Sequence, residues 1–334
     1  MSSILSVQNL TTRFHTFDGT VYAVNGVDFE LQPGETLAVV GESGSGKSVS
    51  VLSLLGLLPA ESAEVKGTAR FQTKETQTDL LAISKDKLNK IRGKHISIVF
   101  QDALRSLNPV LTVGEQISES LMTHMGYNKR RAYTRAVELL ENVGISYPEK
   151  RFYSYPHQFS GGMRQRAMIA IAIACEPEIL VADEPTTALD VTIQTQIVEL
   201  TRRLQREMGM TVIWITHDLG VVAGIADRVM VMYAGMPIEM AKVDDLYENA
   251  QHPYTEGLLG AIPEVGETEQ NRLISIGGAP PDLFEAPKHC QFAWRCPYVF
   301  ERCWKEIPPN YQVEEGHYTK CFYDMSRQQA RDEE

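Results

Sequence analysis

Short, mostly apolar runs recur through the first part of the chain. They lie at 36–40 (TLAVV), 96–100 (ISIVF), 179–182 (ILVA), 212–215 (VIWI) and 229–232 (VMVM). Runs of this length, bounded by turn residues, are typical of strands buried inside a sheet. Because these runs alternate with helical patterns over residues 1–245, the sequence predicts an α/β domain.

A different periodicity occupies the middle of this region. Apolar or small residues follow one another at a spacing of three or four between residues 130 and 143, at Tyr133, Ala136, Val137, Leu140 and Val143. This spacing predicts an amphipathic helix. Residues from about 103 to 165 are therefore expected to form a helical insert between two strands of the sheet.

The pattern changes again after residue 245. Residues 251–334 are rich in proline, aromatic residues and cysteine, and they show few long apolar periodicities. We therefore predict a small C-terminal extension over 246–334, held together by something other than a large apolar core. Its last residues, RQQARDEE, are expected to form a frayed, solvated tail.

Composition and charge narrow the classes of protein. The 334 residues are 43% hydrophobic and 22% charged, which is ordinary for a globular chain. The net charge of −11 argues against a general binder of nucleic acid. No apolar run approaches the ~18–20 residues of a membrane span, and the stretch from Met168 to Cys175 has only eight. The N-terminus lacks a secretory pattern, so a cytoplasmic location is expected.

A glycine-rich octapeptide follows the first buried run. Residues 41–48 read GESGSGKS and match G-x-x-x-x-G-K-[ST] between a predicted strand and a predicted helix. Such a loop turns backbone N–H groups toward phosphate oxygens. Lys47 would reach the β and γ phosphates, and the Ser48 hydroxyl would bind Mg²⁺. The predicted nucleotide-binding residues of the loop are Gly41, Ser43, Gly44, Ser45, Gly46, Lys47 and Ser48.

Two acids end a later strand. The segment 178–184 reads EILVADE, so its apolar run places Asp183 and Glu184 at the exposed end of the strand. Asp183 is predicted to hold Mg²⁺, and Glu184 to act as the general base toward water. Solvated acids at a strand end are the common alternative, but the phosphate loop makes the catalytic interpretation the better one.

A second candidate anion site precedes that strand. Ser160, Gly161 and Gly162 stand at the start of the helical run MRQRAMIAIAIA. A hydroxyl, two glycine N–H groups and a helix N-terminus favour phosphate binding. A simple helix cap is the alternative for this segment taken alone.

Residues 4–245 resemble the ATP-binding cassette (ABC) transporter ATPases. The Ser-Gly-Gly segment matches the family signature L-S-G-G-Q, with departures at Phe159 and Met163. The resemblance implies that Gln101 contacts Mg²⁺ or the attacking water and that His217 contacts the γ-phosphate. It also implies that Asp190 is the D-loop residue. The predicted magnesium ligands are thus Ser48, Gln101 and Asp183.

The adenine contact is less specific. Phe14 lies where the family stacks an aromatic ring on adenine, and Phe17 and Tyr22 are close rivals. The resemblance further implies that two such subunits pair head to tail. Each ATP would then lie between the phosphate loop of one subunit and Ser160, Gly161 and Gly162 of the other, and ATP would close the dimer.

The extension resembles the oligopeptide/dipeptide importer branch of this family. The similarity rests on QHPYT at 251–255 and on IGGAPPDL at 276–283 followed by cysteines. It implies an ATPase that powers a peptide importer at the cytoplasmic face of the membrane. Its partners would be a second ABC ATPase subunit, two permeases and an extracytoplasmic peptide-binding protein. The alternatives are a nickel importer of the same branch and a soluble, non-transport ABC ATPase.

Four of the five cysteines fall in the extension, at Cys290, Cys296, Cys303 and Cys321. Four thiolates can hold an iron–sulfur cluster, and members of this branch with four such cysteines resemble [4Fe–4S] binders. Zinc, with His289 or His317, and free or disulfide-bonded cysteines are the alternatives. Cys175 lies in an apolar helix and is expected to be buried in the core.

Overall fold

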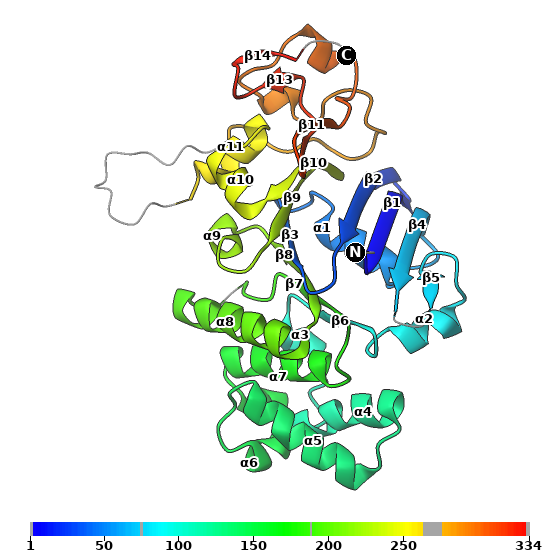
Figure 1. Ribbon diagram of the computed structural model, residues 1–334. Helices are drawn as coiled ribbons and strands as arrows, with labels where there is room; N and C mark the ends of the chain where they lie inside the picture. Colours follow the sequence, from blue (N-terminus) through cyan, green and yellow to red (C-terminus); the bar gives the residue numbers. More distant parts are fainter. Residues whose placement is uncertain (1–2, 74–75, 188, 263–275, 332–334) are drawn as a thin grey trace. The chain divides into compact units, whose positions relative to one another are not determined.

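The computed structural model describes residues 3–73, 76–187, 189–262 and 276–331. Its contacts divide the chain into two compact units. The first unit comprises residues 1–31, 37–82 and 216–334, and the second comprises residues 32–36 and 83–215. Figure 1 labels most helices and strands of both units.

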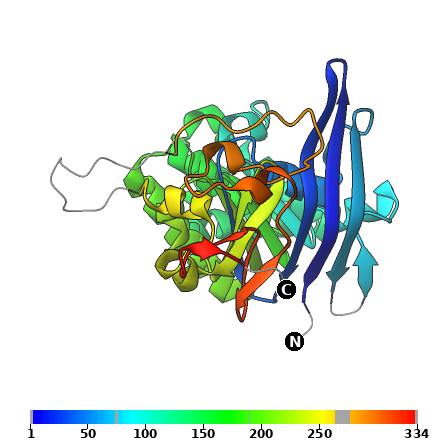
Figure 2. The ribbon, with the colours of Figure 1, turned by 90° about the horizontal axis from the view of Figure 1, so that it is seen from above.

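The first unit begins with an antiparallel sheet of order β2-β1-β4-β5. Its strands are β1 (Leu5–Thr16), β2 (Gly19–Leu31), β4 (Ala63–Gln72) and β5 (Gln77–Asp79). The register between β1 and β2 shifts between Val7 and Leu10, where Asn9 has a positive φ of 48°. This bulge returns Leu10 to the buried face, which strict alternation from Val7 would not do. Figure 2 shows β1 and β2 as two long blue strands.

A second sheet of the first unit combines early and late parts of the chain. β3 (Thr36–Val40) is parallel to β9 (Arg228–Tyr233). Antiparallel pairing then continues through β10 (Met236–Lys242), β12 (His317–Thr319) and β11 (Tyr311–Glu314). The extension therefore contributes two strands to this sheet.

The extension also shares an apolar core with the rest of its unit. Tyr233, Tyr254 and Phe292 are all buried, with ring centroids 4.7 to 5.4 Å apart. The expectation that the extension is held together without a core of this kind is therefore wrong. The helices of the described part of the first unit are α1 (Lys47–Leu54), α9 (Leu219–Val222), α10 (Val243–Glu248) and α11 (Pro253–Leu259). The extension adds 3₁₀ turns at Ala293–Arg295 and Glu301–Trp304.

The predicted frayed tail is also wrong for the residues that the structure describes there. β14 (Gln329–Ala330) pairs with β13 (Tyr323–Asp324). Arg331 lies 3.2 Å from the Asp324 carboxylate and donates to the Gln251 side chain at 2.9 Å. Residues 332–334 of that prediction lie outside the described part of the chain.

The second unit contains three parallel strands, β6 (Ile96–Val99), β7 (Ile179–Asp183) and β8 (Thr211–Thr216). Every residue of β7 and β8 is buried. Burial on both faces explains why these strands were visible in the sequence as continuous apolar runs. The predicted strands at 36–40, 96–100, 179–182, 212–215 and 229–232 are confirmed, with no end differing by more than one residue.

Helices account for most of the rest of the second unit. They are α2 (Lys85–Ile91), α3 (Ala103–Ser106), α4 (Val113–Met125), α5 (Lys129–Asn142), α6 (Pro148–Phe152), α7 (Gly161–Ile173) and α8 (Val191–Met208), with a 3₁₀ turn at Pro156–Gln158. The predicted amphipathic helix is α5, and Figure 1 shows α4, α5 and α6 gathered together. Thr112 and Glu115 form a capping box that starts α4.

Cys175 follows α7 and is buried, as predicted. Burial raises the pKa of its thiol to about 11, so the group is a protonated core residue at neutral pH. Among the described residues, no helix is both long and apolar enough to cross a membrane.

Candidate functional site

The phosphate loop lies in the first unit, between β3 and α1. Gly46 caps α1 in the left-handed conformation, with φ 96°. The Lys47 Nζ atom donates to the carbonyl oxygens of Gly41 and Glu42 at 2.7 and 3.0 Å. The Ser45 hydroxyl is buried and has no hydrogen-bond partner in the described structure. A buried hydroxyl of this kind, beside a lysine and a helix N-terminus, fits a phosphate group.

Glycine is required at the first position of the loop. A Cβ atom on Gly41 would lie 2.2 Å from the Met232 carbonyl oxygen, and φ of Gly41 is +148°. Gly44 also has a positive φ, of +80°, but a Cβ atom there would meet nothing within 4 Å. The loop is therefore closely packed at its start and open at Gly44.

This difference gives a prediction. We expect Gly41→Ala to weaken ATP binding by about 3 kcal/mol, or ~150-fold, because backbone strain and overpacking both act on the loop. Gly44→Ala is the matched control and carries the backbone strain alone, about 1–2 kcal/mol. Equilibrium ATP titration of the two purified variants measures the difference. Equal affinities would contradict the packing argument.

The end of β7 in the second unit brings two predicted catalytic residues together. Gln101 Nε2 donates to Glu184 Oε2 at 2.8 Å, and Thr187 Oγ1 donates to the same oxygen at 3.0 Å. Glu184 has a positive φ of 45°, an uncommon conformation for a residue with a side chain. Asp183 precedes it and is buried. Two donors thus fix one carboxylate oxygen of Glu184 beside a buried acid.

The Ser-Gly-Gly segment starts α7. Ser160 is exposed and caps the helix, with its hydroxyl accepting from the Met163 N–H at 3.3 Å. Gly162 lies against α8, since a Cβ atom there would be 2.9 Å from the Ile193 side chain. Phe159, which departs from the usual signature, is buried with the Arg151 guanidinium 5.6 Å from its ring centre. Phe159 is thus part of the packed interior, whereas Ser160 and Gly161 lie at the surface.

Three other predicted residues occupy the ends of elements. Asp190 is exposed and caps α8, accepting from the Ile193 N–H at 3.0 Å. His217 is exposed directly after β8. Phe14 is half-buried on β1, opposite Val21 of β2.

The rivals of Phe14 for the adenine differ from it in exposure. Phe17 is fully exposed in the turn between β1 and β2, with a relative exposure of 105%. Tyr22 is half-buried, and the Arg13 guanidinium lies 5.1 Å from the centre of its ring.

The three residues predicted to bind Mg²⁺ carry different side-chain donor groups. Ser48 and Asp183 offer a hydroxyl and a carboxylate, and Gln101 offers an amide. Mg²⁺ prefers oxygen ligands of these types, so each of the three residues by itself has a donor suited to the ion. Ser48 belongs to the first unit, whereas Gln101 and Asp183 belong to the second.

The four cysteines of the extension were predicted to bind a metal cluster. None forms a disulfide, and the Cys290 N–H donates to the Cys303 carbonyl at 3.1 Å. Burial raises the pKa of the Cys290 thiol to about 12, and the neighbouring cysteines add to this effect. Burial likewise raises the pKa of the Cys296 thiol to about 11. Within the described ranges, no group of three or more His, Cys, Asp or Glu side chains is placed to hold a metal ion. The structure thus gives the predicted cluster no support.

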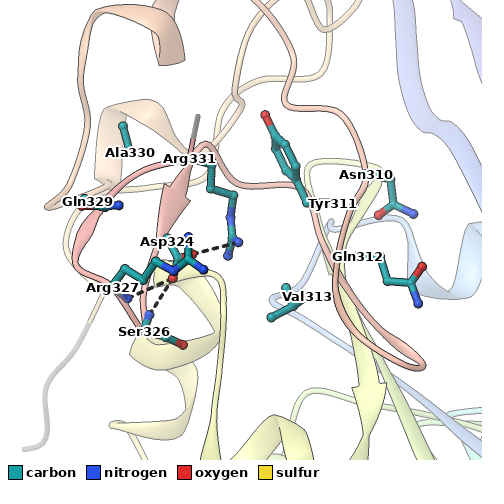
Figure 3. A pocket seen from close by; sticks show the side chains of 10 residues that line it. All are labelled: Asn310, Tyr311, Gln312, Val313, Asp324, Ser326, Arg327, Gln329, Ala330 and Arg331. Carbon is teal, nitrogen blue, oxygen red and sulfur yellow. Dashed lines mark hydrogen bonds and ion pairs between the residues drawn. The ribbon is translucent and has the colours of Figure 1, made fainter. Parts of the chain in front are cut away.

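A pocket of about 580 Å³ lies near the C-terminus, beside β11 and β14 (Figure 3). Asp324 points into this region and accepts from the backbone N–H groups of Ser326 and Arg327, both at 3.0 Å. The Arg331 guanidinium lies 3.2 Å from the same carboxylate. Because these neighbours compensate the charge of Asp324, we assign no ligand to this pocket.

The sequence did not point to the residues that contact the phosphate loop from outside. Arg295 makes an ion pair of 2.6 Å with Glu42, and the Tyr254 hydroxyl accepts from the Glu42 N–H at 2.9 Å. Tyr254 belongs to the QHPYT motif, but nothing in that motif indicates a contact with the loop. A lone arginine between two cysteines carried no signal at all.

Comparison with known proteins finds similarity to transport proteins over nearly the whole chain. Residues 24–187 match the family model described as ABC transporter, and residues 238–303 match that of the oligopeptide/dipeptide transporter C-terminal region. The chain is 50% identical to the dipeptide transport ATP-binding protein DppD of Bacillus subtilis over 328 residues, covering 98% of this chain and 96% of that protein. It is equally identical to the oligopeptide transport ATP-binding protein OppD of Haemophilus influenzae, covering 98% and 99%.

A solved structure agrees with these relatives in fold. The dimeric, post-hydrolysis state of the ATP-binding cassette MJ0796, bound to ADP and Pi, matches with a TM-score of 0.61 at 30% identity. The match covers 72% of this chain and 98% of that one. The α/β cassette fold predicted from the sequence is therefore confirmed.

Proposed function

The chain belongs to the ABC transporter family, in the group of dipeptide and oligopeptide transport ATP-binding proteins, and we propose that it is the ATP-hydrolysing subunit of a peptide importer. One observation carries the peptide assignment. The similarity to DppD and OppD extends over nearly the whole chain and includes the C-terminal region, for which a separate family model exists. This supports peptide over the nickel alternative.

The residues at the end of β7 support a mechanism for hydrolysis. The bonds from Gln101 and Thr187 orient the Glu184 carboxylate, which would take a proton from water as it attacks the γ-phosphate. Lys47 and the Ser45 hydroxyl would bind the phosphates, and His217 would contact the γ-phosphate. Bound Mg²⁺ would neutralise charge on the phosphate oxygens, held by Ser48, Gln101 and Asp183.

The exposed signature segment supports a dimer. Ser160 and Gly161 stand at the surface at the N-terminus of α7, where a phosphate from another subunit could reach them. We propose that Ser160, Gly161 and Gly162 face the ATP of a second ABC ATPase subunit, a paralogue or another copy of the chain. Asp190 would act beside them as the D-loop residue.

The peptide importer group implies further partners. We propose two transmembrane permease subunits and an extracytoplasmic peptide-binding protein, with this chain peripheral at the cytoplasmic face of the membrane. The segment after Gln101 would receive a permease helix. Val110, with a relative exposure of 76%, gives that segment an apolar contact point. Residues 1–245 would form the ATPase domain, with the insert at about 103–165, and residues 246–334 the importer-type extension.

The transport assignment is tested by uptake. Cells that lack the chain, and cells that express it again, are compared for accumulation of labelled dipeptide, longer peptide and nickel. We expect peptide uptake to fall without the chain and to return with it, while nickel uptake stays constant. Loss of nickel uptake alone would replace the proposal with the nickel importer. If both uptakes are unchanged and the chain co-fractionates with ribosomes or DNA, the soluble non-transport class would be correct.

The [4Fe–4S] cluster stays a prediction from the spacing of Cys290, Cys296, Cys303 and Cys321. Anaerobically purified protein is analysed for iron, sulfide and zinc, together with its absorption spectrum. About four irons per chain with a broad band near ~400 nm would establish the cluster. Stoichiometric zinc or no metal would remove it and leave the ATPase assignment intact.

A further inference from the structure

Glu42, the second residue of the phosphate loop, is held by two residues of the extension. Arg295 Nη1 donates to Glu42 Oε2 at 2.6 Å, and Arg295 Nη2 donates to Glu42 Oε1 at 3.0 Å. The Glu42 N–H donates to the Tyr254 hydroxyl at 2.9 Å. The loop is therefore bound from outside through both the side chain and the backbone of one residue.

Arg295 is fixed in place by more than this pair. Its side chain is only 4% exposed. Its Nε donates to the Gly277 carbonyl at 2.9 Å, Nη1 also donates to the Tyr233 hydroxyl, and Nη2 also donates to the Ile276 carbonyl, both at 3.3 Å. The guanidinium thus uses all five of its N–H groups, which a lysine could not do.

Tyr254 is equally constrained. It is fully buried, and its ring packs against those of Tyr233 and Phe292 at centroid distances of 4.7 and 5.4 Å. At the start of α11, His252 Nδ1 accepts from the Tyr254 N–H at 3.0 Å. A ring held on both sides gives its hydroxyl a defined position against the loop.

Glu42 also contacts the lysine of the phosphate loop. The Glu42 carbonyl accepts from Lys47 Nζ at 3.0 Å, so the same residue touches Arg295, Tyr254 and Lys47. The extension also contacts β2 beside Tyr22, one of the candidates for the adenine contact, since the Tyr22 N–H donates to the Leu283 carbonyl at 2.7 Å. Figure 2 shows the orange segment of the extension running toward the blue strands β1 and β2.

We propose that Arg295 and Tyr254 are positioning residues of the ATP site, which hold Glu42 so that the phosphate loop keeps its nucleotide-binding shape. The proposal rests on the ATPase function proposed above. It makes the C-terminal extension part of the ATP site of its own subunit, in addition to any role in the importer.

ATP affinity and turnover of the full chain test this proposal. We expect Arg295→Lys to raise the Kd for ATP about tenfold, because the two-point bond to Glu42 is lost while the charge is kept. Tyr254→Phe removes only the hydroxyl and is expected to raise the Kd about fivefold. Arg302→Lys is the matched control, since Arg302 lies in the same extension and pairs with Glu306. It should leave the Kd unchanged.

Two further readouts separate positioning from simple anchoring of the extension. Saturating ATP should restore the turnover of Tyr254→Phe, so that the change lies in KM more than in kcat. The double variant Arg295→Lys with Glu42→Gln should bind ATP no more weakly than Arg295→Lys alone, because both changes break one pair.

An unchanged Kd for ATP in both Arg295→Lys and Tyr254→Phe, with only a lower Tm, would overturn the proposal. If Arg295→Lys fails to fold, Tyr254→Phe decides by the same criterion. If the wild-type chain itself neither binds nor hydrolyses ATP, the proposed function fails instead.

Discussion

Replacing Glu184 by glutamine is expected to lower kcat for ATP hydrolysis by about 10²- to 10⁴-fold, the contribution of a positioned general base. The glutamine keeps the volume and one acceptor oxygen, so the donors from Gln101 and Thr187 can remain in place. What is lost is the basic oxygen that takes the proton from water. ATP affinity should stay within about twofold, because the change removes an interaction made only in the transition state.

The matched control for this variant lies in the same segment. Glu178 directly precedes β7, so it lies at the opposite end of this strand from Glu184. Its carboxylate lies 3.1 Å from the His95 ring. Glu178→Gln should therefore hydrolyse ATP at the wild-type rate. Phosphate release and ATP binding are measured side by side for both variants. If Glu184→Gln hydrolyses ATP within about threefold of wild type, Glu184 is not the base.

Replacing Glu239 by alanine is expected to destabilise the extension by about 3–5 kcal/mol, because several buried donors would lose their acceptor at a cost of ~1–3 kcal/mol each. Glu239 and His317 are both buried, with 2.8 Å between Oε1 and Nε2. The same carboxylate accepts from the backbone N–H groups of Gln251 and His252, at 2.5 and 3.0 Å. The alanine would leave these donors buried without an acceptor.

Burial lowers the pKa of the neighbouring His252 to about 3, so that its imidazole is neutral at pH 7. Denaturant unfolding and amide hydrogen exchange of β10 and β12 measure the loss. Glu239→Gln, which keeps the shape and one acceptor, should lose less. Glu314→Ala, at an exposed position of the adjacent β11, should lose almost nothing. Wild-type exchange rates in Glu239→Ala would refute the network.

The sequence by itself determined the cassette. The phosphate loop, the acids at the end of β7 and the Ser-Gly-Gly segment are each local, because strands and helix ends position backbone groups within a few residues. The buried strands were equally visible, since burial on both faces leaves continuous apolar runs. The matches of the chain to peptide-transport ATPases confirm the family that these motifs indicated.

Only the tertiary structure decided how the extension is used. The sequence suggested a separate module with little core of its own. Instead, β12 pairs with β10, Phe292 packs on Tyr233, and Arg295 reaches Glu42 across 253 positions of the chain. Such contacts leave no periodic pattern, because they depend on which distant segments the topology brings together. A buried arginine and its half-buried glutamate partner look like two surface charges until the fold removes water from around them.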